Sequence, residues 1–84
     1  MNSSANTLGR FVADIMKKHN HNNSSLAAVA GVSESVIRNL LKHGLETRVK
    51  DPDPRTLRRV ADALDVDAIM LFRLAGYISP QANA

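Results

Sequence analysis

Apolar residues recur every three or four positions in several separate stretches of this chain, which is the spacing of amphipathic helices. In the first stretch these positions are Leu8, Phe11, Val12, Ile15 and Met16. Thr7 stands just before them and carries a hydroxyl suited to an N-cap. We therefore predict a first helix that begins after Thr7 and ends near Lys18.

Residues 23–42 predict two short helices joined by a turn. The first runs from about Ser24 to Ala30, with Leu26, Val29 and Ala30 on one apolar face. Gly31 can adopt a positive φ and end this helix at little cost. Ser33 then offers a side-chain oxygen to the open N–H groups of the following helix.

The second helix of this pair has an apolar back and a polar front. Either Val36 or Ile37, and either Leu40 or Leu41, points toward the core. The outward positions are Glu34, Ser35, Arg38, Asn39 and Lys42. Two helices packed across a tight turn in this way are typical of a helix-turn-helix.

Two more helices follow a loop over residues 45–53. Asp53 and Pro54 mark a helix start, with the carboxylate as a cap and proline in the first turn. The buried stripe of this helix is predicted to be Leu57, Val60, Ala61 and Leu64. Asp67 is the predicted cap of a last helix that ends near Ala75. The fold class is therefore all-α, with five helices around one core.

Residues 26–41, LAAVAGVSESVIRNLL, resemble the helix-turn-helix of the lambda-repressor/Cro-like (XRE) family. The matching features are the small residue Ala27, the turn Gly31-Val32-Ser33, and Ile37 four residues after Ser33. The proline-started helix and the later run ALDVDAIMLF resemble the end of the family's domain, so the match covers about residues 8–71. The resemblance implies a compact five-helix lambda-repressor-like domain that binds double-stranded DNA.

By the family's pattern, one set of residues falls on positions that face bases or nearby phosphates: Ser33, Glu34, Ser35, Arg38 and Asn39. Asn23 falls where the family often anchors a phosphate through an amide, and Lys42 falls at the far end, beside phosphate. Side-chain chemistry agrees with base contacts, because Arg can bond guanine and Asn can bond adenine.

Two positions depart from the family. Glu34 places a negative charge where Gln or a basic residue is common; it either accepts from a cytosine amino group or caps the helix dipole. Leu41 stands where the family frequently has Glu, and we expect it to make an apolar contact near Ile15 and Met16 instead.

The net charge is +3, and the basic residues are unevenly distributed. Residues 34–59 carry seven Lys or Arg, against Arg73 alone after them, so positive charge is expected beside the second helix of the pair and its loop. Arg48 and Lys50 in that loop are candidate phosphate contacts; the alternative is a solvated loop.

The last predicted helix carries more apolar groups than one face of a short helix can hold: Ile69, Met70, Leu71, Phe72, Leu74, Tyr77 and Ile78. Either some of them cover the chain's own core, or residues 69–78 form a homodimer contact, as is frequent in the family. A dimer would read two half-sites on one face of the DNA.

The remaining features of the sequence limit the domain organisation, the kinds of site and the location that we expect. We expect one domain over residues 7–78 between a flexible N-terminus, 1–6, and a flexible tail, 79–84, which is either a true end or a linker. The chain has no Cys, and His19 and His21 alone do not make a metal site. No metal, cofactor, catalytic residue set or membrane span is predicted, and a cytoplasmic location is expected.

Two functions remain open at this stage. The first is a sequence-specific transcriptional regulator, most simply a repressor, that inserts residues 34–42 into the major groove. The alternative is an antitoxin-like or adaptor module that uses the same fold to bind another protein. An enzyme is not expected, because no nucleophile–base set or phosphate loop is visible.

Overall fold

The computed structural model describes residues 7–46 and 49–77. Its regular elements are five helices: α1 (Leu8–Lys18), α2 (Asn23–Ala30), α3 (Glu34–Lys42), α4 (Pro54–Leu64) and α5 (Ala68–Ala75). The all-helical class and the five helices are confirmed. The predictions for residues 1–6 and 79–84, for Arg48 and for Ile78 fall outside the described residues. Within the described ranges, no helix has the length and apolarity needed to cross a membrane.

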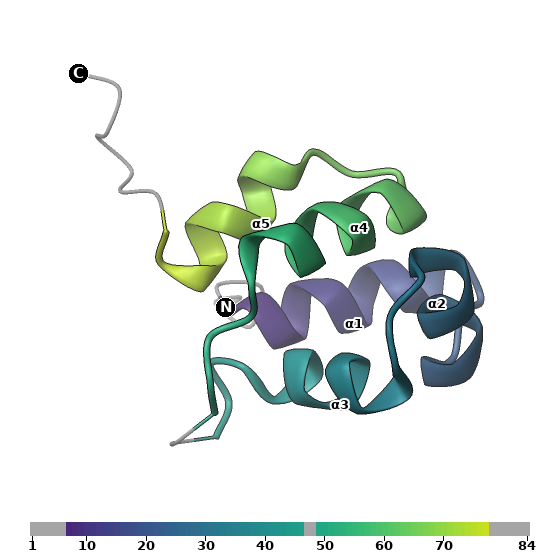
Figure 1. Ribbon diagram of the computed structural model, residues 1–84, viewed down its shortest axis with the longest axis horizontal. Coiled ribbons are helices and arrows are strands. Elements are labelled where there is room, and N and C mark those ends of the chain that lie inside the picture. The colour runs from purple at the N-terminus through teal and green to yellow at the C-terminus, as the bar shows by residue number, and fades with distance from the viewer. Residues whose placement is uncertain (1–6, 47–48, 78–84) are drawn as a thin grey trace.

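The five helices pack into a compact bundle. Figure 1 shows α1 between α3 on one side and the α4–α5 pair on the other, with α2 across one end. The most extensive packing is between α1 and α3 and between α4 and α5, while α2 contacts both α3 and α4. This arrangement leaves the side of α3 that faces away from α1 open to solvent (Figure 1).

One continuous core receives side chains from all five helices. The largest fully buried members are Leu8, Val12, Leu26, Ile37, Leu40, Leu57, Val60, Leu64 and Leu71. In α3 the two predicted alternatives are resolved, since Ile37 and Leu40 are buried while Val36 and Leu41 are only half-buried. The predicted buried stripe of α4 is confirmed in full.

The prediction that Val29 belongs to the buried face of α2 is wrong, because this side chain is 62% exposed. The buried residues of α2 are Leu26, Ala27 and Ala30. Because α2 packs against α3 and α4 at once, its buried face is centred toward the two alanines. The small alanine side chains allow this close approach, and the resulting orientation of α2 about its axis leaves Val29 facing solvent.

Side-chain caps define most of the helix starts. The Thr7 hydroxyl accepts from the Arg10 amide, Ser33 accepts from the Val36 amide, and the Asp67 carboxylate accepts from the Ile69 amide. At α4 the predicted carboxylate cap is wrong, since Asp53 makes no such bond. Pro54, with its φ preset for a helix, begins the first turn without it.

Glycine is required at two places that position α3. Gly31 ends α2 with a φ of 75°, in the left-handed region, and its amide donates to the Ala27 carbonyl at 2.9 Å. Gly9 lies where the start of α1 meets the end of α3. Its amide donates to the His43 carbonyl at 3.0 Å, and a Cβ built on Gly9 would clash with the Leu41 carbonyl oxygen.

Replacing Gly9 by alanine should therefore destabilise the domain strongly. The added methyl meets backbone rather than a movable side chain, so α1 and α3 must separate, at an expected cost of about 3 kcal/mol. Urea unfolding followed by circular dichroism measures the loss. The matched control is Arg10→Ala, which introduces the same residue at an exposed neighbour and should cost less than about 0.5 kcal/mol. Equal unfolding midpoints for the two variants would contradict the close approach.

Candidate functional site

The open side of α3 is a continuous polar surface. Burial of Ile37 and Leu40 turns the predicted outward residues to solvent, and all of them are exposed: Glu34, Ser35, Arg38, Asn39 and Lys42. We call these five residues the outer face of α3. Ser33 precedes them, and its hydroxyl is occupied as the helix cap, accepting from the Val36 amide at 3.3 Å.

Three side chains of the outer face are joined by hydrogen bonds. Arg38 Nη1 donates to Glu34 Oε1 at 3.2 Å, and Arg38 Nη2 donates to Ser35 Oγ at 3.2 Å. The acid and the base are four residues apart and both are about half exposed. The leading end of the outer face therefore carries a paired charge, whereas Lys42 adds a positive charge at the other end.

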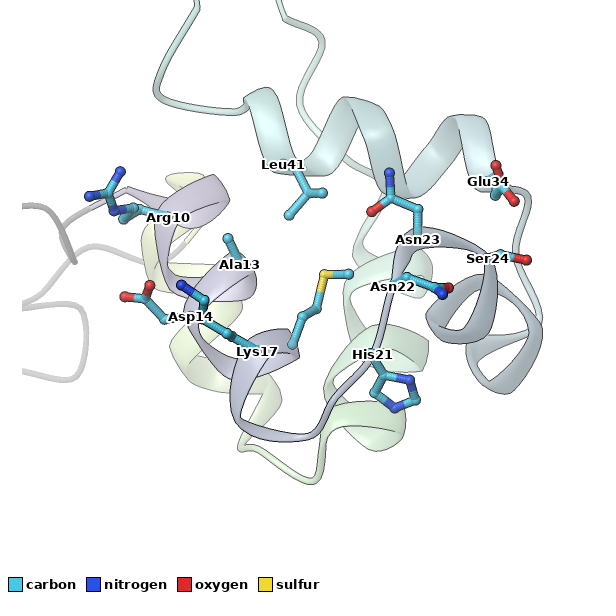
Figure 2. Close-up of a pocket in the computed structure, with 11 residues that line it drawn as sticks. Arg10, Ala13, Asp14, Lys17, His21, Asn22, Asn23, Ser24, Glu34 and Leu41 are labelled. Atoms are coloured by element: carbon cyan, nitrogen blue, oxygen red, sulfur yellow. The ribbon is translucent and has the colours of Figure 1, made fainter.

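A hollow of about 830 Å³ lies beside the outer face, between α1, the start of α2 and α3. Figure 2 shows Arg10 and Lys17 on α1, Asn22 and Asn23 at the start of α2, and Glu34 at the start of α3 around it. Asn23, the predicted phosphate anchor, is half-buried here. The hollow thus brings Asn23 and Glu34 to one rim and mixes both signs of charge.

The floor of this hollow is apolar. Leu41 points from α3 toward Ala13 on α1 in Figure 2, and Met16 lines the same space. The apolar environment expected for Leu41 is therefore present near Met16. Ile15 does not share it, because that side chain lines a separate surface depression with Phe11.

The start of α2 is held by local hydrogen bonds. Asn22 Oδ1 accepts from the Ser25 amide at 2.8 Å, and the Ser25 hydroxyl accepts from the Asn22 amide at 3.0 Å, which completes a capping box. His21 Nδ1 lies 2.9 Å from the same hydroxyl. These bonds fix the backbone that presents Asn23.

Asn39 and Lys50 line one hollow on the other flank of α3. Together with Asp51 and Asp53 they line a hollow of about 260 Å³, backed by Val36 and Leu40. The structure therefore places the predicted loop residue Lys50 beside the outer face. It also places two carboxylates there, which reduces the local positive potential.

The loop that carries Lys50 is anchored from two directions. The His43 ring, at the end of α3, donates from Nε2 to Asp51 Oδ1 at 2.8 Å. The Tyr77 hydroxyl, after the end of α5, donates to the Pro52 carbonyl at 2.6 Å. Neither anchor was predicted, because both join residues whose proximity depends on the tertiary fold. Together they hold the loop between the ends of α3 and α5.

The basic residues are spread more widely than their order in the chain indicated. Arg55, Arg58 and Arg59 belong to α4, which packs on α2 and α5 rather than along α3. Arg55 and Arg58 line a separate depression with Pro54. Arg59 is different, since a Cβ placed on Gly31 would lie 3.2 Å from its Nη1. Its guanidinium thus stands beside the turn before α3, a position that sequence reasoning missed.

Comparison with known proteins returned no relative. No family model matches this chain, and neither a curated protein nor a solved structure matches it. Within residues 7–46 and 49–77, no three His, Asp or Glu side chains gather where they could hold a metal ion. The function is therefore inferred from the geometry of the outer face and its surroundings.

The C-terminal helix divides its apolar residues between core and surface. Leu71 and Ala75 are buried, and Phe72 and Leu74 pack partly against the core. Ile69, Met70 and Tyr77 remain exposed, by 40% to 46%. Leu71, Phe72 and Leu74 therefore cover the chain's own core. The three exposed residues are available to a partner, and the homodimer contact stays a prediction.

Removal of the Tyr77 hydroxyl should loosen the loop beside α3. Tyr77→Phe deletes the bond to the Pro52 carbonyl, and we expect a loss of about 0.5–1.5 kcal/mol in stability. Amides of residues 50, 51 and 53 should exchange with deuterium faster, while those of α1 keep their rates. Met70→Leu, a change at an exposed apolar residue within α5, is the control. Unchanged exchange in Tyr77→Phe would show that the loop is held without this bond.

Proposed function

We propose that this protein is a sequence-specific, double-stranded DNA-binding transcriptional regulator of repressor type. The observation that carries the proposal is the outer face of α3, a polar helix surface backed by a buried apolar core and open to solvent. The fold proposed with it is the lambda-repressor-like arrangement, in which α2 and α3 form the helix-turn-helix. Support for that arrangement comes from the turn at Gly31 and from α3 packing on α1.

The dimensions and chemistry of α3 suit a major groove. The groove is about 12 Å wide and admits one α-helix, and each base pair presents its own pattern of donors and acceptors there. Arg38 offers a fork of donors for guanine, and Asn39 offers a donor and an acceptor for adenine. In the proposed complex, α3 enters with its N-terminus first, so that Ser33, Glu34 and Ser35 come nearest to the bases.

Phosphate contacts would flank this helix on three sides. Lys42 lies at its far end, Lys50 on the anchored loop, and Asn23 at the capped start of α2. Arg59 adds a positive charge beside the turn before α3. These groups fix the position of a protein on DNA without reading its sequence.

The proposed assembly is a homodimer through the exposed apolar residues of the α5 region, Ile69, Met70 and Tyr77. A two-fold dimer would present two copies of α3 to half-sites about 34 Å apart on one face of the duplex. The operator would then be a palindrome.

A second candidate is a protein-interaction module of antitoxin-like or adaptor type. It is favoured by Val29, 62% exposed on α2, and by the exposed apolar residues of α5. Purified protein that binds no duplex at low salt, together with a co-purifying partner that covers α3, would favour this candidate over DNA binding.

Selection of binding sites from random duplexes, followed by gel shift over a range of salt concentrations, tests the main proposal. We expect a preferred palindromic sequence. Arg38→Ala and Asn39→Ala should each lower the preference for that sequence over unrelated DNA by about 1–3 kcal/mol. Both residues are exposed, so the unfolding midpoint should move little. Loss of folding in either variant would show that the assigned orientation of α3 is wrong.

Lys42→Ala and Lys50→Ala should weaken binding to all sequences by a similar factor. Each removes one phosphate contact, so the slope of log K against log salt should become shallower by about 0.9 per binding subunit. Lys18→Ala, at the exposed end of α1, is the control. A change of sequence preference in either variant, with an unchanged salt slope, would contradict the assignment to phosphate.

A further inference from the structure

The one acidic residue on the outer face of α3 is paired with the residue best suited to read a base. Glu34 Oε1 accepts from Arg38 Nη1, and Ser35 Oγ accepts from Arg38 Nη2, both at 3.2 Å. The two contacts hold the guanidinium from two sides along the same helix. We propose that Glu34 is a positioning residue that sets the specificity of Arg38 for guanine over phosphate. This inference rests on the proposed DNA-binding function.

The pair leaves Arg38 able to bind a base. A guanidinium has five N–H donors, and the two contacts use one on each terminal nitrogen. Three donors therefore remain, including one on each terminal nitrogen. Guanine presents two acceptors, O6 and N7, on its major-groove edge, and the fork geometry of arginine matches them. Holding the fork in place reduces the side-chain entropy lost when that contact forms.

The negative charge of Glu34 discriminates between the two acceptors that Arg38 can meet on DNA. A phosphate carries a full negative charge, which the neighbouring carboxylate repels. The edge of guanine is uncharged as a whole, so the same carboxylate opposes it far less. An arginine without this neighbour would be drawn to any phosphate. The pair therefore lowers the affinity of α3 for arbitrary DNA more than its affinity for a site with guanine in register.

Two other roles for Glu34 make different predictions. An acid in the first turn also interacts favourably with the helix dipole, but Ser33 already provides the side-chain cap of α3. If Glu34 instead contacted a cytosine amino group directly, removing the Glu34 carboxylate would reduce affinity for the preferred site. Positioning of Arg38 instead predicts that the loss raises affinity for unrelated DNA and erodes the preference for guanine.

The experiment compares wild type with Glu34→Gln, which keeps the shape and an acceptor oxygen but removes the charge. Each protein is titrated with its selected duplex, with the same duplex in which the guanine required by Arg38 is replaced by adenine, and with an unrelated duplex. For Glu34→Gln we expect tighter binding to the unrelated duplex and a salt slope steeper by about 0.9 per subunit. We call the affinity for the selected duplex divided by the affinity for the adenine-substituted duplex the guanine ratio. In Glu34→Gln this ratio should fall about three- to tenfold, which is part of the discrimination that a bidentate pair supplies.

Two controls separate positioning from net charge. Glu46→Gln removes the same charge from an exposed residue outside α3, and it should leave the guanine ratio unchanged. In Arg38→Ala the ratio is already lost, so adding Glu34→Gln should change it no further. Circular dichroism of each variant verifies the helical content before titration.

The outcomes distinguish this inference from the function on which it rests. A wild-type protein that prefers no sequence overturns the proposed function itself. A selective wild type whose guanine ratio is unchanged in Glu34→Gln overturns the positioning role alone, and so does a fall in the ratio that persists in the Arg38→Ala background.

Discussion

The rotation of α3 about its own axis depends on the burial of Ile37 and Leu40, and the candidate interface depends on that rotation. Both side chains are almost completely removed from solvent. Turning α3 by one residue, about 100°, would expose them and bury either the Asn39 amide or the Arg38 guanidinium, which costs free energy. The contact of Gly9 with the end of α3 then fixes how closely the helix lies against α1. The outer face is thus a consequence of core packing.

Local features of the fold could be predicted from the sequence because local chemistry specifies them. Thr7, Ser33 and Asp67 cap their helices as their side chains indicated, and Gly31 takes the left-handed conformation that the turn requires. The error at Val29 arose because periodicity alone allows neighbouring choices of buried face. Only the simultaneous contact of α2 with α3 and α4 selects the alanine side.

The candidate site was predictable where it lies on one helix and not where it joins distant segments. The outward orientation of Arg38 and Asn39 followed from the apolar spacing of α3. The Glu34–Arg38 pair has the four-residue separation of helix neighbours, so its spacing was visible in the sequence. By contrast, the positions of Arg59 beside Gly31 and of Tyr77 on Pro52 depend on how α4 and α5 pack. No spacing along the chain contains that information.

The charge around α3 bears on how the proposed complex would obtain its affinity. Glu34 offsets Arg38, and Asp51 and Asp53 share a hollow with Lys50. Three phosphate contacts per subunit, from Lys42, Lys50 and Arg59, would give a salt slope of only about −2.7. A single subunit would then bind weakly at physiological salt. Two linked subunits would double that slope, and the acids would still suppress binding to arbitrary DNA. In the proposed complex, selectivity therefore comes from base contacts and paired half-sites rather than from a large positive surface.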